Sequence, residues 1–379
     1  MKDAPDHAGE PADLEFMRLA LRLARRGFGH TSPNPMVGAV LFRDGIVIGQ
    51  GWHRRAGCPH AEIEALSSAR NDAKGATLFV TLEPCSTHGR TPPCTDAVIA
   101  AGIRRVVAAA EDPNPAHRGK GFAILRKAGI SVSTGLLAEE ATDLNEVFNH
   151  WIVHRTPFVT IKAAMSLDGK IATTIGESRW ITGEKSREAG MKLRAGVDAI
   201  LVGVNTITAD NPSLTVRLRG FGDKPTRRII LDPNGRSPLE AKVFNDSHAD
   251  LTTLVVTRKA AKRRLKEFSE RVHVIEAPER NGMIDLRWLL RTLGKENVTS
   301  ILVEGGGETN AGFLEQGLAQ RIQFFYAPMV LGGRLAPKAV GGNGVLRTRD
   351  AIQLQEPKWK RLGPDLLLTA RVAATKRQV

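Results

Sequence analysis

Apolar and polar positions along the chain predict a hairpin followed by alternating helices and strands. Val37–Phe42 and Ile46–Trp52 have strand character and flank Asp44-Gly45, a dipeptide typical of hairpin turns. The unbroken apolar run Thr77–Leu82 predicts a buried strand. Asp13 is expected to cap a first helix that runs to about Arg26. Further helices are expected at 60–69, 94–101 and 139–150, a strand at 104–110, and a helix–strand pair within 121–134.

A second block of the same kind starts after Arg155-Thr156-Pro157. Its strands are expected at 158–164, 199–202, 228–231, 252–256, 272–275, 300–303 and 322–326, and its helices include 184–195 and 285–293. No repeat relates the two blocks. We therefore expect a loose tail over 1–12, a three-layer α/β/α domain over 13–154 and a second α/β domain over 155–379.

His60-Ala61-Glu62, Cys85 and Cys94 have the composition of a catalytic zinc site. Such a site uses three protein ligands and leaves one position open for water. One imidazole and two thiolates supply the three ligands. Glu62 then remains as the proton carrier, as in zinc deaminases that act on cytosine- and adenine-type rings. Zinc would lower the pKa of its water to about 7.

The predicted elements bring these residues to suitable places. Cys85 follows the 77–82 strand, and Pro92-Pro93 precede a helix that Cys94 opens, where the helix dipole favours a thiolate. The usual spacing of two residues between the cysteines is replaced by eight. The alternative is that all three cysteines are ordinary buried thiols. Cys58 is interpreted as a bystander.

Composition narrows the function further. The chain has 379 residues and a formal net charge of +14, which suits anionic small substrates as well as nucleic acid. It has no apolar run of about 20 residues and no apolar signal segment, so we expect no membrane partner. Three cysteines fit a reducing cytoplasm. The basic residues lack the aromatic interleaving of a single-strand binding groove.

In the second block, Glu304-Gly305-Gly306-Gly307 follows a strand and precedes a helix expected at 310–316. Glycines there would let backbone N–H groups approach a phosphate, although an ordinary tight turn has the same pattern. Arg194, Arg217 and Arg219 are candidate anion contacts. From these residues alone, the second domain is expected to bind a phosphorylated ligand.

A set of short motifs, in a fixed order, runs through both blocks: Ser32-Pro33-Asn34-Pro35-Met36-Val37-Gly38, Gly51-Trp52-His53, Pro59-His60-Ala61-Glu62, Leu82-Glu83-Pro84-Cys85-Ser86, Gly89-Arg90-Thr91-Pro92-Pro93-Cys94, Asp112-Pro113-Asn114-Pro115, Ser166-Leu167-Asp168-Gly169, Trp180-Ile181-Thr182, Asp210-Asn211-Pro212 with Leu214 and Arg217, and Glu304-Gly305-Gly306. With these motifs the chain resembles the bifunctional deaminase–reductases of riboflavin biosynthesis from about Asp13 to near the C-terminus. In that family the long loop between the cysteines is usual.

The resemblance implies two reactions. An N-terminal domain similar to cytidine deaminase would use one zinc ion to remove a ring amino group from a ribosylaminopyrimidine 5′-phosphate. A C-terminal domain similar to dihydrofolate reductase would then use NADPH to reduce the ribose to a ribityl chain. The expected partner is therefore a small phosphorylated pyrimidine, with no nucleic acid, and a homodimer or homotetramer is expected.

The resemblance also implies site residues. Zinc ligands would be His60, Cys85 and Cys94, with Glu62 catalytic. The deaminase substrate would contact Asn34, His53 and the loop between the cysteines, where Thr87 replaces a frequent histidine and His88 is the substitute. NADPH would contact Ala164, Trp180, Thr206, Asp210 and the stretch Gly306, Gly307, Glu308, Thr309, Asn310, Ala311 and Gly312. The reductase substrate would contact Ser178, Arg194, Leu214, Arg217 and Glu304.

Two other functions are compatible with parts of the pattern. The zinc motif and the positive charge also suit a nucleic-acid base deaminase, such as a tRNA-editing enzyme with a C-terminal binding module. The scarcity of aromatic residues and the reductase-like motifs oppose it. A structural zinc site would need a fourth ligand, and only Cys58 offers one.

Overall fold

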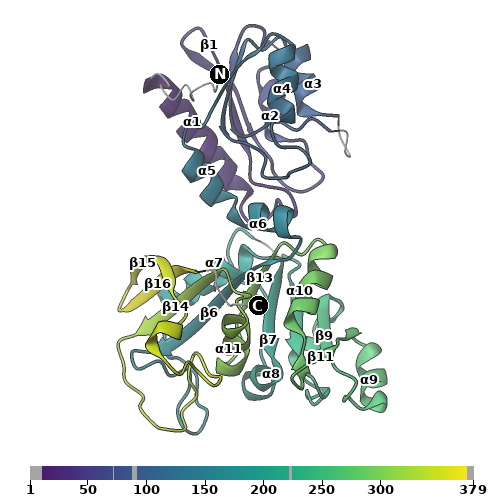
Figure 1. Ribbon diagram of the computed structural model, residues 1–379, viewed down its shortest axis with the longest axis vertical. Coiled ribbons are helices and arrows are strands. Elements are labelled where there is room, and N and C mark those ends of the chain that lie inside the picture. Colours follow the sequence, from purple (N-terminus) through teal and green to yellow (C-terminus); the bar gives the residue numbers. More distant parts are fainter. Residues whose placement is uncertain (1–10, 71, 88–91, 222–223, 374–379) are drawn as a thin grey trace. The chain divides into compact units, whose positions relative to one another are not determined.

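The computed structural model describes residues 11–70, 72–87, 92–221 and 224–373. The chain divides into two compact units between Arg155 and Thr156. Each unit has its own sheet, and no strand is shared between them (Figure 1). The two units are therefore described separately.

The first unit has a five-stranded sheet of order β2-β1-β3-β4-β5. Strand β1 pairs antiparallel with β2 and β3, while β3, β4 and β5 run parallel. Its strands are β1 (Gly38–Arg43), β2 (Ile46–Trp52), β3 (Thr77–Leu82), β4 (Arg105–Ala110) and β5 (Ser131–Thr134), and its helices are α1 (Pro11–Ala24), α2 (Ala61–Ser68), α3 (Cys94–Ala100), α4 (Lys120–Lys127), α5 (Ala138–Leu144) and α6 (Glu146–His154).

Helices cover both faces of this sheet. On one face α2, α3 and α4 pack on a core that includes Ala65, Val98 and Leu125. On the other face α1 and α5 lie together, with Met17 and Ala141 in their core (Figure 1). The result is the three-layer α/β/α sandwich that the hydrophobic pattern predicts, with β3 buried along its whole length.

Two details of the first unit differ from the sequence prediction. Helix α1 begins at Pro11, so Asp13 lies inside it and does not cap it. The Asp13 carboxylate instead accepts two hydrogen bonds from Arg105, at 2.7 and 3.2 Å. The helix expected at 139–150 is two helices, α5 and α6, which meet at Asn145.

The second unit contains a nine-stranded sheet of order β10-β9-β8-β7-β13-β6-β14-β16-β15. The strands from β10 to β14 run parallel, and β16 and β15 are added antiparallel at one edge. The strands are β6 (Phe158–Ser166), β7 (Ala199–Gly203), β8 (Arg227–Leu231), β9 (Thr252–Val256), β10 (His273–Glu276), β13 (Ser300–Val303), β14 (Arg321–Ala327), β15 (Leu354–Leu362) and β16 (Asp365–Val372), with a small separate pair β11 (Glu279–Arg280) and β12 (Met283–Ile284).

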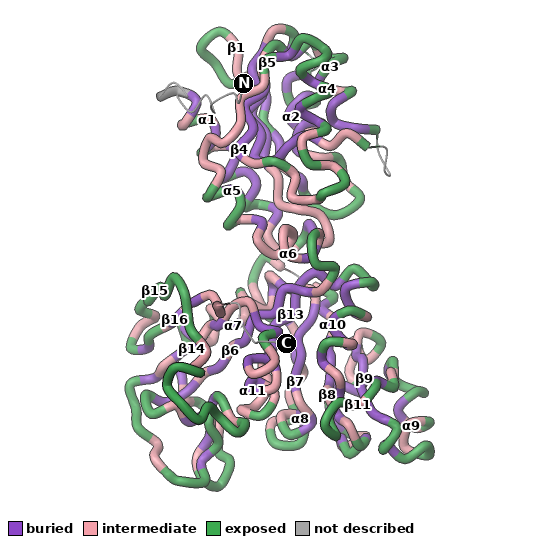
Figure 2. The backbone as a smooth tube through the Cα atoms, viewed as in Figure 1, coloured by how far each residue is buried: buried purple, intermediate pink, exposed green. Residues whose placement is uncertain are grey.

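Helices again cover both faces of the sheet. Residues of α10 (Leu286–Lys295) and α11 (Gly307–Glu315) pack on one face. Residues of α7 (Glu184–Ala195), α8 (Val204–Asp210) and α9 (Lys262–Ser269) pack in a second core on the other face. Strands β7 and β13 lie buried in the middle of the sheet (Figure 2). Ligands of such sheets bind beyond the carboxyl ends of the parallel strands.

The sequence pattern did not predict β15 and β16. Strand β15 lies at the edge of the sheet and is exposed over almost its whole length. It has a bulge between Gln355 and Lys358, and Glu356 there has a φ of 50°. Charged residues, an internal proline and a bulge are devices that discourage further pairing at a sheet edge. Across the described parts of the chain, the helices are too short or too polar to span a bilayer.

Candidate active sites

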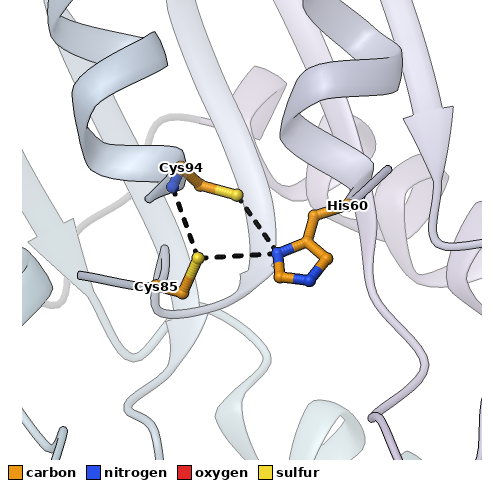
Figure 3. A group of neighbouring side chains, drawn as sticks. All are labelled: His60, Cys85 and Cys94. Carbon is orange, nitrogen blue, oxygen red and sulfur yellow. Dashed lines mark hydrogen bonds between the residues drawn. The ribbon is translucent and has the colours of Figure 1, made fainter. Parts of the chain in front are cut away.

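The first site is formed by His60, Cys85 and Cys94, whose donor atoms all lie within 4.8 Å of one another (Figure 3). His60 Nδ1 is 3.2 Å from Cys94 Sγ and 3.5 Å from Cys85 Sγ. Zinc bonds of about 2.0 Å to nitrogen and 2.3 Å to sulfur place these atoms about 3.5 Å apart in a tetrahedron. Both the donor types and their spacing therefore fit zinc.

The local fold explains this arrangement. His60 is the N-cap of α2, with extended backbone, so its side chain lies beyond the helix end. Cys94 is the first residue of α3, after Pro93. Cys85 follows the buried strand β3, and its sulfur accepts the backbone N–H of Cys94 at 3.3 Å. A helix N-terminus stabilises negative charge on a sulfur placed in this way.

The electrostatics of the three residues also favour a cation. Hydrogen bonds from Cys94 and His60 lower the pKa of Cys85 to about 4, although burial opposes this. The adjacent Cys85 and burial raise the pKa of Cys94. Two thiolates at this distance need a compensating positive charge, and a divalent metal ion would supply it.

Glu62 lies in the first turn of α2, next to the Cys94 thiol, and is only 3% exposed. Burial, followed by the negative charge of Cys85, raises the pKa of Glu62 to about 7. A carboxyl group with this pKa takes up and releases a proton near neutral pH. The structure thus places the predicted proton carrier beside the predicted metal ligands.

Asn34 and His53 form a second part of this site. Asn34 Nδ2 lies 3.1 Å from His53 Nε2, and His53 Nδ1 lies 3.0 Å from the Pro59 carbonyl oxygen. A carbonyl only accepts, so Nδ1 carries the proton and Nε2 accepts from Asn34. Burial lowers the pKa of His53, which agrees with this neutral form. Its ring meets the His60 ring edge-on at 5.4 Å between centroids.

The loop between the two cysteines is only partly described. His88 lies outside the described residues, and Thr87 is exposed. Cys58 is half-buried and is not part of the group formed by His60, Cys85 and Cys94.

In the second unit, Glu304 follows β13 and forms a buried ion pair with Arg194 of α7. Arg194 Nε and Nη2 donate to the two Glu304 oxygens at 2.7 and 2.9 Å, and Arg194 Nη1 donates to the Thr215 carbonyl at 3.1 Å. Lys162 Nζ is 3.7 Å from Glu304 Oε2. Burial would raise the pKa of Glu304, but the two cations outweigh it and lower the pKa to about 2.

Lys162 was missed by the sequence analysis. It stands in the middle of β6, a strand that is otherwise almost entirely buried, and a charged residue in such a strand was the available signal. Ala164, predicted to contact NADPH, is two residues further along β6 and therefore faces the same side of the sheet. The structure thus brings Lys162, Ala164, Arg194 and Glu304 to one region.

Ser178 and Asp210 also meet. Ser178 Oγ donates to Asp210 Oδ1 at 2.9 Å, at the end of α8, the helix that also contains Thr206. Trp180 is 68% exposed, and the Arg187 guanidinium carbon lies 4.6 Å from the centroid of its ring. An exposed ring beside a cation is available to stack on a ligand.

Leu214 and Arg217 lie in the segment after α8. Leu214 is 2% exposed, with a φ of 51°, and its side chain belongs to the second core. If Leu214 contacts the substrate, it must do so through its backbone atoms, because its side chain is buried in the core. Arg217 is exposed.

The glycine-rich turn leads into α11, which begins at Gly307 rather than at the expected residue 310. Gly306 is the N-cap, and a Cβ atom added there would meet no heavy atom within 4 Å. At Gly307 such an atom would lie 2.4 Å from the Lys338 carbonyl oxygen. Open space at a helix N-terminus fits a phosphate of NADPH.

The rest of the predicted cofactor stretch is less open. Thr309 packs close to Gly203 and Gly305, and Ala311 is buried. Asn310 is fully buried; its Nδ2 donates to the Ala339 carbonyl at 2.7 Å, and its Oδ1 lacks a partner among the described residues. Glu308 is exposed, and Gly312 lies near the Leu286 side chain.

Two family models match the chain. The model described as the cytidine and deoxycytidylate deaminase zinc-binding region matches residues 11–110. The RibD C-terminal domain model matches residues 157–368. The two matches fall in the first and second units respectively and agree with the predicted deaminase-like and reductase-like folds.

Relatives match across both units. The riboflavin biosynthesis protein RibD of Aquifex aeolicus is 44% identical over 358 residues, which cover 94% of this chain and 97% of the relative. The Escherichia coli RibD protein is 40% identical over 362 residues, which cover 94% and 98%.

Two solved structures have the same architecture. Acinetobacter baumannii RibD is 35% identical, with a TM-score of 0.85 over 95% of this chain and 99% of that one. A diaminohydroxyphosphoribosylaminopyrimidine deaminase/5-amino-6-(5-phosphoribosylamino)uracil reductase from Thermotoga maritima is 34% identical, with a TM-score of 0.80 over 95% and 99%.

Proposed function

The chain belongs to the RibD family of bifunctional riboflavin-biosynthesis enzymes, and on this premise we propose how its residues carry out two reactions. It is a zinc-dependent deaminase and an NADPH-dependent reductase. The first substrate is 2,5-diamino-6-ribosylamino-4(3H)-pyrimidinone 5′-phosphate, and the second is 5-amino-6-(5-phosphoribosylamino)uracil, whose ribose becomes ribityl. The observation that carries this assignment is the group of His60, Cys85 and Cys94 beside the buried Glu62.

In the deaminase, His60, Cys85 and Cys94 hold one zinc ion. When bound, zinc supplies Lewis-acid activation of the water that attacks the amino-bearing ring carbon. Glu62 takes up a proton from that water on its carboxylate and passes it to the departing amino nitrogen, so that ammonia leaves. Proton transfer by a positioned side chain typically raises a reaction rate by about 10²–10⁴-fold. The burial of Glu62 supports this role, because it keeps the carboxyl group able to hold a proton near neutrality.

Asn34 and His53 bind the pyrimidine of the first substrate, and His88 completes the contact from the loop between the cysteines. His53 is held neutral and in one tautomer by the Pro59 carbonyl. Asn34 is oriented by His53 in turn. A fixed tautomer gives a site a defined pattern of donors and acceptors, which favours one ring edge over another.

In the reductase, NADPH supplies the hydride for C1 of the ribose. The cofactor is held by Ala164, Trp180, Thr206, Asp210 and the stretch Gly306, Gly307, Glu308, Thr309, Asn310, Ala311 and Gly312. The space at Gly306 supports this placement of a cofactor phosphate. Asn310 and Ala311 of this stretch are buried, and the Asn310 side chain ties α11 to the Ala339 carbonyl.

The second substrate is bound by Ser178, Arg194, Leu214, Arg217 and Glu304. Arg194 and Glu304 act as one unit, since each neutralises the other, and the nearby Lys162 adds a positive charge suited to an anionic substrate. Arg217, exposed on the segment that follows α8, is available for the substrate phosphate.

A nucleic-acid base deaminase with a C-terminal binding module is not supported. The second unit matches the RibD C-terminal domain, and relatives at about 40% identity span both units. Incubating the purified protein with the first substrate and NADPH tests the assignment directly. Ammonia release followed by NADPH oxidation is expected, and ammonia release without oxidation would remove the reductase half of the proposal.

We also propose a homo-oligomer, dimer or tetramer, located in the cytoplasm. Large apolar side chains are exposed on the loops after β6 and β14, notably Leu167, Val330, Leu335 and Leu346. The two loops meet where the Leu167 N–H donates to the Met329 carbonyl, and exposed apolar side chains that gather in one place commonly mark contacts between chains. A reducing compartment would preserve the two thiol ligands of zinc. Light scattering coupled to gel filtration measures the oligomeric state, and a monomer at micromolar concentration would contradict the first proposal.

A further inference from the structure

Glu83 is a buried carboxylate that closes the loop following β4. It is 5% exposed, and its Oε2 accepts the backbone N–H groups of Asp112 at 3.1 Å and Gly119 at 2.9 Å. β4 ends at Ala110 and α4 begins at Lys120, so these two residues are the second and the last of the connection between them, and the segment 112–119 is called the loop below. A single carboxylate oxygen therefore holds both ends of the loop together.

The other oxygen of Glu83 caps α4. Oε1 accepts the N–H groups of Gly121 at 2.8 Å and Phe122 at 3.4 Å, both in the first turn of that helix. A negative charge at a helix N-terminus is favourable, and hydrogen bonds to a charged acceptor are stronger than neutral ones. Gly121 also lies against the Pro84 carbonyl, since an added Cβ would be 2.2 Å from that oxygen.

Within the described parts of the first unit, the loop has little other support. Its residues Asp112, Pro113 and Arg118, with the preceding Glu111, line a cavity of about 480 Å³, so packing does not fix that side. Inside the loop, Asp112 Oδ1 accepts the N–H of Asn114 at 2.8 Å, which shapes the turn but does not attach it to the rest of the domain. Among the residues that the structure describes, the side-chain hydrogen bonds that attach the loop to the domain come from Glu83.

This loop borders the metal ligands. Strands β3 and β4 are parallel neighbours, so Cys85 after β3 and Asp112 after β4 lie at the same edge of the sheet. Glu83 itself stands two residues before Cys85. The position of the loop thus depends on the same short segment that carries the zinc ligand.

We propose that Glu83 is a positioning residue of the deaminase, which sets the 112–119 loop against the metal site and so shapes the wall of the substrate pocket. It acts through the loop and does not touch the substrate. The inference rests on the proposed assignment of His60, Cys85 and Cys94 to the deaminase site.

The test compares Glu83→Gln with the wild type. The amide would present its NH₂ group to two backbone donors, so in either orientation two N–H groups lose their acceptor. The kcat/KM for deamination should fall about 10- to 100-fold, mainly through KM, as expected for loss of one or two charge-assisted hydrogen bonds. Zinc should remain at about one per chain, and amide hydrogen exchange over 112–122 should accelerate.

Asp13→Asn is the matched control. Asp13 is equally buried, at 5% exposed, and pairs with Arg105 at the amino end of β4, the end opposite to the loop. This variant should lose thermal stability without a change in the KM for deamination. In both variants, reduction of pre-deaminated substrate should stay within about twofold of the wild type, because the second unit is separate.

Glu83→Asp provides a second measurement if the glutamine variant does not fold. This variant keeps the negative charge but shortens the side chain. The KM for deamination should therefore rise, by a smaller factor than in Glu83→Gln. An unchanged KM in both variants, or loss of zinc together with deamination, would overturn the positioning role. Absence of deamination in the wild type would instead contradict the proposed function.

Discussion

The Gly306→Val variant distinguishes two roles for the glycine-rich turn before α11, namely a binding site for NADPH and an ordinary chain reversal. The φ and ψ of Gly306 are −74° and 179°, a conformation open to any residue, and no heavy atom lies within 4 Å of the position of a Cβ. The substitution should therefore change the free energy of unfolding by no more than about 1 kcal/mol. A larger loss of reductase activity in this variant would therefore reflect weaker cofactor binding and not a less stable fold.

The expected loss concerns NADPH. A phosphate at the N-terminus of α11 would accept backbone N–H groups, and the valine side chain would occupy its space. Loss of such charge-assisted contacts costs about 2–3 kcal/mol, which corresponds to a roughly 30- to 150-fold rise in the Kd for NADPH. Ammonia release should continue at the wild-type rate, since the zinc site lies in the other unit.

Calorimetric titration with NADPH measures this directly, with Gly307→Ala for comparison. At Gly307 a Cβ would be 2.4 Å from the Lys338 carbonyl oxygen, so that variant should lose thermal stability as well as affinity. NADPH binding to the wild type should also weaken as salt is added, because charge attraction assists it. Equal Kd values for the wild type and Gly306→Val would refute the reasoning and leave the glycine turn as a turn only.

Three further predictions concern the other groups. Cys85→Ser should lose zinc and deamination together, as followed by metal analysis and ammonia release; full deamination by metal-free protein would contradict the metal assignment. Glu62→Gln should keep zinc and reduction while deamination falls by at least about 10²-fold, and near-normal turnover would exclude Glu62 as the acid/base. The pKa of Glu304 in the folded protein, about 2, lies below its ordinary value of 4.5. The ionised carboxylate therefore adds roughly 3 kcal/mol to the free energy of unfolding above pH 4.5, and this stabilisation is lost as the pH falls towards 2. In urea unfolding, the stability gap between wild type and Glu304→Gln should shrink as the pH falls from 5 to 3, and a constant gap would contradict this account.

Elements with an uninterrupted apolar pattern were predictable from the sequence. The strands over 77–82, 252–256 and 300–303 and the helix over 184–195 have the expected bounds. The three strands are buried along their whole length, which leaves a continuous apolar run in the sequence, whereas the helix shows only a narrow set of buried small residues, Ser186, Gly190 and Ala195. The grouping of His60, Cys85 and Cys94 was predictable for a related reason, because a strand end and two helix starts fix their positions.

Contacts that depend on the tertiary fold could not be read in this way. The edge strand β15 is exposed over almost its whole length, so it can contain charged residues and a proline, and its sequence does not favour a strand. Arg194 and Glu304 were predicted as separate substrate contacts. In the fold they form an ion pair, which the sequence could not show because they are 110 positions apart. Asp13 was predicted to cap a helix because only its local sequence was considered. Its actual partner, Arg105, is 92 positions away along the chain.

The order of strands in the second sheet has a consequence for the growing polypeptide on the ribosome. The first unit is complete once residue 155 has emerged, so it can fold while the remainder is still being translated. Strand β6, in contrast, lies between β13 and β14, which begin at residues 300 and 321. At about 5–20 residues per second, this largely apolar strand waits on the order of 10 s for its neighbours. During that interval the nascent reductase exposes β6 to chaperones and to other nascent chains, whereas the deaminase ahead of it is already folded.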